Sequence, residues 1–371
     1  MAGSPSPQPG PASEAAPASP PAPAATAAPV AEGSASPAAA AAAAPAEDPQ
    51  IEAETFVEDN DRDSVLDDGQ LSAFTASLTS SVVNYPVEHG RRYHAFRSGV
   101  YCLPNDEIEL DRLDLTHALM TKGTGDKLFL APIEGEKLHR ILDIGTGTGI
   151  WAMCMGDEFP NAEVLANDLS AVQPNWVPPN VKFEIDDVES PWLHNMPFDY
   201  IFCRYMAACI QDWPKLVGNI FEHLAPGGWA EFQDFDLQYY SEDGSLTEEN
   251  DTMKWINTLL DAARKIGRDP CPGASLEKWV NDAGFTEVVH HRFRFPVGPW
   301  PRDAKLKEVG MYNLSQVLQG LEGFSLRLFC DVLGWRQEEV LVLTSKVRKE
   351  LKNLNVHAQF DFHVVYGRKP I

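Results

Sequence analysis

The chain has 371 residues and a formal net charge of −24, with 54 acidic and 30 basic side chains. This excess of negative charge argues against a protein held on nucleic acid by a broad phosphate-binding surface, so we expect no direct nucleic-acid binding, although a local basic groove is not excluded. No stretch approaches the ~20 apolar residues that cross a bilayer, and we therefore expect no contact with a membrane.

The six cysteines show no C-x-x-C spacing and lie mostly within apolar segments. Cysteines of this kind are typical of reduced thiols inside the cell, so we expect neither a disulfide framework nor a metal site. The N-terminal segment lacks the basic residues of a signal peptide or of a mitochondrial presequence. Together these features predict an intracellular protein, located in the cytoplasm or the nucleus.

Residues 1–69 differ in composition from the rest of the chain. The first 50 residues are mostly Ala, Pro and Ser without Lys or Arg, and residues 51–69 add a run of acids. Proline interrupts any helix that the alanines start, and almost no side chain there is large enough to build a core. We expect a disordered tail, which has either no specific role or serves as a spacer or docking segment.

Residues 70–371 are expected to form one domain, in which an N-terminal cover over 84–138 precedes a core over 139–250. The cover contains a predicted helix over Asp106–Met120, which begins with acids in its first turn. Predicted core strands are Arg140–Ile144, Glu163–Ala166, Val181–Ile185, Tyr200–Cys203 and Trp229–Phe232, and predicted helices are Ile150–Phe159 and a segment from Asp212 to Pro226. This alternation indicates an α/β fold with a parallel sheet and helices on both faces.

The pattern changes after residue 250. Helices are predicted near 251–266, 275–283, 303–320 and 337–353, an extended segment at 286–295, and a last strand at Phe360–Tyr366 within 358–367. The last two strands are therefore separated by a helical insertion of roughly sixty residues. We expect the helical part, about 251–355, to act as a lid or partner-binding element.

A glycine loop follows the first core strand. Residues 143–149 read Asp-Ile-Gly-Thr-Gly-Thr-Gly and lie directly before a predicted helix. Glycines permit positive φ angles and let a ligand approach the backbone closely. Asp168, which ends the second strand, comes 23 residues after Gly145, close to the spacing of a carboxylate that binds ribose hydroxyls.

Two cofactors use this geometry, and the residues favour one of them. A dinucleotide site requires glycine at position 150, where this chain has isoleucine. Asp143 would repel a pyrophosphate but suits an ammonium group, and S-adenosylmethionine carries an ammonium, a ribose and no phosphate. Asp186 and Asp187 end the third strand, where a carboxylate can accept a hydrogen bond from an adenine amino group. We therefore predict S-adenosylmethionine as the cofactor.

Nine short strings in this chain carry a family resemblance. They are Glu88–His94, Leu103–Glu107, Asp111–Leu115, Leu142–Trp151, Asn167–Ser170, Gln173–Asn180, Phe183–Asp187, Phe198–Ile201 and Leu224–Trp229. They resemble class I S-adenosylmethionine-dependent methyltransferases, and more narrowly the fungal LaeA-like branch linked to secondary metabolism. The resemblance covers roughly 84–371 and is firmest between 141 and 235. It implies a Rossmann-like sheet of seven strands with helices on both faces.

The resemblance also implies roles for individual residues. Asp143, Gly145, Gly147 and Gly149 would hold the methionyl end, Asp168 the ribose, and Asp187 with its neighbouring backbone the adenine. The further members of the predicted cofactor set are Thr146, Leu169, Asp186, Val188 and Tyr93. Tyr93 belongs to the segment before the core and would stack on the adenosine, or else pack structurally.

No general base is assigned from the sequence. Arg204 and Tyr205 occupy the position where such enzymes line the methyl-transfer site, but a salt-bridged arginine and a packed tyrosine fit equally well. His94 is a further catalytic candidate, with a structural histidine as the alternative. Methyltransferases that act on the amino groups of bases or glutamine carry Asn/Asp-Pro-Pro-Tyr here, whereas residues 203–206 read Cys-Arg-Tyr-Met.

Three functional hypotheses remain open. The chain is a tailoring enzyme that methylates an O, N or C atom of a small natural-product intermediate by in-line transfer, or a nuclear LaeA-like regulator that acts with transcriptional protein partners, or a cofactor-binding scaffold without turnover. The first hypothesis predicts a closed apolar pocket beside the sulfonium of the cofactor.

Overall fold

The structure is a computed structural model that describes residues 80–97, 99 and 101–371. The predicted tail, residues 1–69, lies outside this part, so its disorder stays a prediction. All described residues belong to one compact unit, which spans 64–371. No helix among the described residues is long and apolar enough to cross a bilayer.

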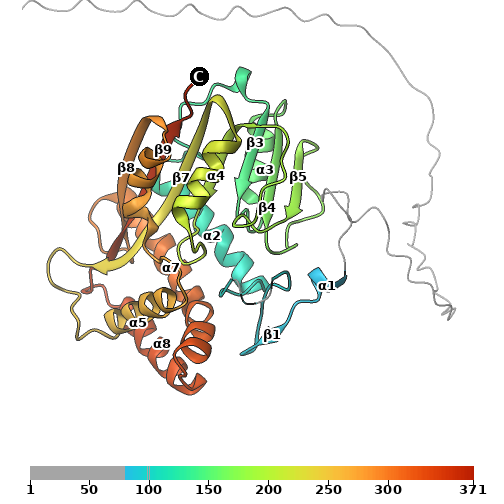
Figure 1. Cartoon of the computed structure of the whole chain (residues 1–371). Helices are drawn as coiled ribbons and strands as arrows, with labels where there is room; N and C mark the ends of the chain where they lie inside the picture. Colours follow the sequence, from blue (N-terminus) through green and yellow to red (C-terminus); the bar gives the residue numbers. More distant parts are fainter. Residues whose placement is uncertain (1–79, 98, 100) are drawn as a thin grey trace, which may run out of the picture. The chain divides into compact units, whose positions relative to one another are not determined.

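A sheet of seven strands forms the centre of the unit (Figure 1), in the order β5-β4-β3-β6-β7-β9-β8. The strands are β3 (Arg140–Ile144), β4 (Glu163–Asp168), β5 (Val181–Ile185), β6 (Phe198–Arg204), β7 (Leu224–Tyr240), β8 (Thr286–Pro296) and β9 (Gln359–Arg368). Strands β3 to β7 are parallel, and β9 runs antiparallel between β7 and β8. The predicted fold class is confirmed.

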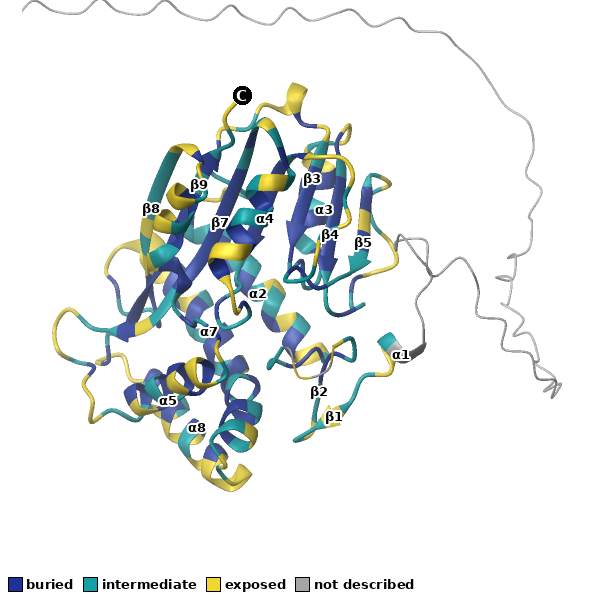
Figure 2. Cartoon of the chain, in the orientation of Figure 1, coloured by how far each residue is buried: buried dark blue, intermediate teal, exposed yellow. Residues whose placement is uncertain are grey.

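Helices cover both faces because neighbouring residues of a strand point to opposite sides. Ile141 packs with Trp151 and Met155 of α3 (Ile150–Glu158), whereas Leu142 packs on the other face with α4 (Trp213–His223) and α6 (Leu276–Asp282). In Figure 2 the central strands are buried over most of their length, as expected for a parallel sheet that is covered twice.

The remaining long helices pack together in a third cluster. They are α2 (Glu107–Gly123), α5 (Asp251–Lys265), α7 (Ala304–Arg327) and α8 (Gln337–Leu351), and α7 continues into a π-helix at Leu328–Val332. In Figure 1 they lie at the end of the sheet toward which β3 and β4 point. The segment before α2 contains α1 (Ser80–Val83) and a hairpin of β1 (Val87–Glu88) and β2 (Arg91–Arg92).

Two elements extend well beyond their predicted bounds. The sequence indicated a short strand at Trp229–Phe232, but β7 begins at Leu224 and ends at Tyr240. It extends to Tyr240 because β9 pairs with it as far as that residue. The Pro-Gly-Gly string at 226–228 forms an irregularity inside the strand, with Gly227 at φ +80°, and does not separate the helix from the strand. Helix α7 runs beyond the predicted end at 320.

A buried ion pair connects α2 to α7. The Arg112 guanidinium is fully buried and donates to both carboxylate oxygens of Glu109, at 3.0 and 2.6 Å. It also donates to Thr116 at 3.1 Å, to the Tyr205 hydroxyl at 3.2 Å and to the Gln316 amide oxygen of α7 at 3.0 Å. One side chain thereby holds three distant segments of the chain together.

We expect Glu109→Gln to lower the free energy of unfolding by about 3–5 kcal/mol, because it leaves the Arg112 charge buried without a partner. Urea unfolding measures the change. Glu339→Gln on α8 is the matched control, since its ion pair with Arg336 lies at the surface and its loss should leave the midpoint unchanged. Equal effects of the two substitutions would contradict the role given to Arg112.

Candidate active site

A cavity of about 140 Å³ lies at the carboxyl ends of the parallel strands. The loops after β3, β4, β5 and β6 contribute 145–148, 167–170, 186–189 and 204–206, and α2 closes the cavity with Thr116, His117 and Met120 among others. Parallel sheets bind ligands at this edge, because the ends of all the strands and the loops that follow them converge there.

The glycines of the loop serve two purposes. All three have positive φ angles, +66° at Gly145, +58° at Gly147 and +80° at Gly149. A Cβ atom on Gly145 would lie 2.5 Å from the Met206 sulfur, and one on Gly149 would lie 2.6 Å from the Phe183 ring. Gly145 and Gly147 line the cavity, whereas Gly149 lies at the N-cap of α3 and lets that helix approach β5.

Asp168 at the end of β4 is held in place by two backbone amides. Its Oδ2 accepts a hydrogen bond from the Gly147 amide at 2.9 Å, and its Oδ1 accepts one from the Ser170 amide at 2.9 Å. Burial raises the pKa of this carboxyl to about 6, although both hydrogen bonds act in the opposite direction. The carboxylate thus fixes the glycine loop and also borders the cavity, as does the neighbouring Leu169.

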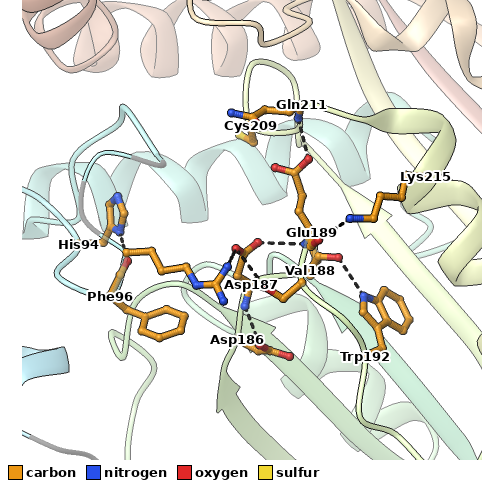
Figure 3. Close-up of polar contacts among 12 residues, drawn as sticks. His94, Phe96, Asp186, Asp187, Val188, Glu189, Trp192, Cys209, Gln211 and Lys215 are labelled. Carbon is orange, nitrogen blue, oxygen red and sulfur yellow. Dashed lines mark hydrogen bonds and ion pairs between the residues drawn. The ribbon is translucent and has the colours of Figure 1, made fainter.

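The end of β5 supplies the other acids (Figure 3). Asp187 accepts a hydrogen bond from the Glu189 amide at 2.9 Å and pairs with the Arg97 guanidinium, and Asp186 accepts one from the Asp187 amide at 2.8 Å. Asp186, Asp187 and Val188 all line the cavity. The predicted ribose and adenine residues therefore meet at one edge of the cavity, although Arg97 already occupies one oxygen of Asp187.

The chain is similar to several known proteins. A methyltransferase-domain family model matches residues 117–291. The methyltransferase pytC of Aspergillus terreus is 49% identical over 295 residues, which cover 79% of this chain and 91% of that protein. The secondary metabolism regulator LAE1 of Cochliobolus heterostrophus is 36% identical over 77% of this chain and 95% of its own length. The chain belongs to this methyltransferase family.

Among solved structures, phosphoethanolamine N-methyltransferase 2 of Haemonchus contortus in complex with S-adenosyl-L-methionine is 19% identical, covers 70% of this chain and 52% of its own, and has a TM-score of 0.41. The family identifies the chain as an S-adenosylmethionine-dependent methyltransferase. The predicted class, the LaeA-like resemblance and the predicted cofactor are confirmed.

Asp143 of the methyltransferase does not border the cavity. It is 3% exposed and lies beneath the loop, where its Oδ2 accepts a hydrogen bond from the Thr146 hydroxyl at 2.6 Å. Burial raises the pKa of the Asp143 carboxyl to about 7, against the opposing effects of Thr146 and of the Arg204 charge. Thr146 does line the cavity, so Asp143 acts on the site through this hydroxyl.

His117 is a site residue that sequence reasoning missed. Arg204 donates from Nη2 to His117 Nδ1 at 2.9 Å, and because a guanidinium only donates, the imidazole proton must lie on Nε2. Burial and the Arg204 charge lower the pKa of His117 to about 3. The ring is therefore neutral at pH 7 and offers the cavity a donor, not a general base. The spacing of Leu110, Leu113 and His117 on one helix face could have revealed it.

Tyr205 and the residues after it form a strained turn. Tyr205 and Ala208 have φ angles of +59° and +60°, which are uncommon for residues other than glycine. Asp234, which the sequence analysis also missed, is 1% exposed and accepts hydrogen bonds from the amides of Met206 at 2.7 Å and Ala207 at 3.3 Å. A carboxylate on β7 thus holds the turn at the cavity.

Tyr93 and His94 lie outside the cavity. Tyr93 is fully buried, and the carbon of the Arg327 guanidinium lies 4.5 Å from the centre of its ring. Both ring nitrogens of His94 contact backbone oxygens, those of Phe96 at 2.8 Å and Tyr101 at 3.1 Å. The structure gives both side chains packing roles, and Tyr101 is the aromatic residue of this segment that lines the cavity.

We expect the free energy of unfolding of the Asp143→Asn variant to rise relative to that of the wild type as the pH rises from 5 to 8. The folded carboxyl has a pKa of about 7 and the ordinary value is 3.8, so between these values only the folded state keeps the proton. In the wild type, the contribution of the protonated Asp143 carboxyl to the free energy of unfolding is therefore present below pH 4 and is lost as the pH approaches 7.

Urea unfolding at each pH measures the stability difference between this variant and the wild type. Asp282→Asn, at an exposed position of α6, is the control and should show a difference that does not change with pH. A constant difference for Asp143→Asn as well would contradict a protonated carboxyl at this position.

Proposed function

We propose that the cavity binds S-adenosylmethionine with its methionyl end at Gly145–Gly147, its ribose at Asp168 and its adenine beside Asp186–Val188. The charge of the lining supports this assignment most directly. Among the described residues that line the cavity, Asp168, Asp186, Asp187 and Glu189 stand against the single guanidinium of Arg204. Such a lining favours a cationic ligand without phosphate and disfavours a dinucleotide.

The shape of the loop fits the same ligand. Glycines at positive φ leave the backbone open where a ligand must approach, and a Cβ atom on Gly147 would meet only Leu113, at 3.5 Å. The room above this glycine is therefore available to the ligand.

When bound, the cofactor supplies a methyl group on a positively charged sulfur. An acceptor atom would use a lone pair to form the new bond to this carbon, the carbon–sulfur electrons would stay with sulfur, and the proton of the acceptor would pass to water. The protein has to align the acceptor with the methyl group, and positioning of this kind can lower a barrier by about 7–11 kcal/mol. His117 and Arg204 contribute donors at this edge of the cavity.

We further propose that the acceptor is a small molecule of fungal secondary metabolism. The identity to the methyltransferase pytC, 49%, exceeds the 36% to the regulator LAE1. The tailoring hypothesis requires an apolar pocket beside the sulfonium, and an apolar pocket that shares three lining residues with the proposed cofactor cavity supports it.

The test of cofactor binding is calorimetric titration with S-adenosylmethionine, S-adenosylhomocysteine and NADH. We expect the two adenosyl ligands to bind and NADH not to bind. Asp168→Asn should weaken both adenosyl affinities at least about tenfold, because a charged acceptor of hydrogen bonds is lost. Binding should also weaken below pH 6 in the wild type, as Asp168 becomes protonated, and less so in the variant.

Asp282→Asn is the control and should bind like the wild type, since this residue lies on the surface of α6. Unchanged affinity of the Asp168→Asn variant would remove the ribose assignment. Binding of NADH alone would overturn the assignment of the whole cavity.

The second candidate function is that of a nuclear regulator acting with transcriptional protein partners, and the relationship to LAE1 supports it. Removal of residues 1–69 separates the two proposals. A tailoring enzyme should keep its full rate of methyl transfer without them. A regulator that docks through this segment should lose its effect on transcript levels of secondary-metabolite genes, measured in cells that carry the truncated chain.

A further inference from the structure

A second cavity of about 70 Å³ adjoins the first one. Tyr101, Tyr205 and Cys209 line both cavities, so the two meet at these side chains. The second cavity lies between the helices α5 and α7 on one side and two strand ends on the other, the C-terminal part of β7 and the N-terminal end of β9. Its apolar lining includes Phe235, Phe360, Trp255, Leu259 and Val317.

No charged side chain lines the second cavity among the described residues. A charged ligand would lose its hydration there without gaining a partner, which is strongly unfavourable. The contrast with the first cavity, which four carboxylates border, indicates that the two spaces receive ligands of different chemistry.

The polar groups that line the second cavity include the Gln316 amide and the hydroxyls of Tyr101, Tyr205 and Tyr239. The Gln316 amide is engaged on both sides, since its oxygen accepts from Arg112 at 3.0 Å and its nitrogen donates to Asn313 at 2.9 Å. The Tyr205 hydroxyl accepts from Arg112 at 3.2 Å. Because arginine only donates, the proton of this hydroxyl is left for another acceptor, and no described residue takes it.

The position of Tyr205 is fixed from several sides. Its amide donates to the Gln233 oxygen at 2.9 Å, its ring meets Phe235 edge-to-face at 5.3 Å, and its φ is +59°. A backbone in this region persists only where the surroundings hold it, and such residues concentrate at functional sites. The tyrosine therefore presents a donor at the junction of the two cavities.

We propose that the second cavity binds the methyl acceptor, that the acceptor is an uncharged small molecule, and that the Tyr205 hydroxyl donates a hydrogen bond to one of its oxygen atoms. The proposal rests on the assignment of the first cavity to the cofactor. It excludes ammonium, carboxylate and phosphate groups from the part of the acceptor that is buried, and it makes Arg112 a positioning residue for Tyr205.

Three probes with the same ring system and different charge test the chemistry. The full-length protein, saturated with S-adenosylhomocysteine, is titrated with 2-naphthol, 2-naphthoate and 2-naphthylmethylamine, which are neutral, anionic and cationic at pH 7. We expect 2-naphthol to bind at least about tenfold more tightly than either charged probe.

Two substitutions locate the site. Tyr205→Phe should weaken binding of 2-naphthol by roughly threefold to tenfold, the loss of one hydrogen bond. Leu259→Trp should abolish it by filling the cavity, while S-adenosylhomocysteine still binds, since Leu259 lines the second cavity alone. Leu341→Trp, at an exposed position of α8, is the matched control and should change neither affinity.

The outcomes distinguish this inference from the proposed function. Two results would overturn this inference while S-adenosylhomocysteine still binds. One is that 2-naphthol binds no more tightly than the charged probes, and the other is that the Leu259→Trp variant binds 2-naphthol like the wild type. In either case the second cavity is not the acceptor site, and the cofactor assignment stands. N-acetylmethionine amide is an uncharged mimic of a methionine side chain within a protein. If it binds more tightly than 2-naphthol, the cavity accepts a protein side chain and the inference is overturned. If the wild type fails to bind S-adenosylhomocysteine, both proposals fall together.

Discussion

The buried guanidinium of Arg112 is the constraint on which both cavities depend. It comes from α2, pairs with the Glu109 carboxylate, and also donates to Tyr205 at the end of the sheet and to Gln316 on α7. A buried charge cannot be left unpaired without a large loss of stability, so the three segments have to remain together. The helical insertion is therefore attached to the core at the point where the two cavities meet.

The site combines opposite electrical environments over a short distance. At the strand ends, four carboxylates and one guanidinium border the first cavity, which suits the proposed cationic cofactor. Beneath the helices the lining carries no charge among the described residues, which suits an uncharged acceptor. Tyr205 lies at the boundary between the two cavities. It belongs to a strained turn, and the Asp234 carboxylate stabilises this turn by accepting hydrogen bonds from two of the turn's backbone amides. Cofactor and acceptor would thus be selected by different physical effects, charge on one side and desolvation on the other.

The architecture also explains how a methyltransferase and a regulator of secondary metabolism can share one scaffold. The first cavity, proposed for the cofactor, is built from the ends and loops of the parallel strands, whereas the second cavity, proposed for the acceptor, depends on α5 and α7, which lie outside the alternating core. Changes in these helices can alter the second cavity and leave the glycine loop intact. The methyltransferase pytC and the regulator LAE1 both match this chain over more than three quarters of its length.

The sequence by itself determined the alternation of strands and helices, the glycine loop and the acids at the ends of β4 and β5, because each is a pattern of residues within a short stretch of the chain. Only the tertiary structure placed Asp143 beneath the loop, moved Tyr93 and His94 out of the cavity, and brought in His117 and Asp234. It also formed the second cavity, whose lining residues come from six separate segments of the chain. Contacts such as that of Arg112 with Gln316, which are 204 residues apart, leave no periodic signal, because packing alone brings them together.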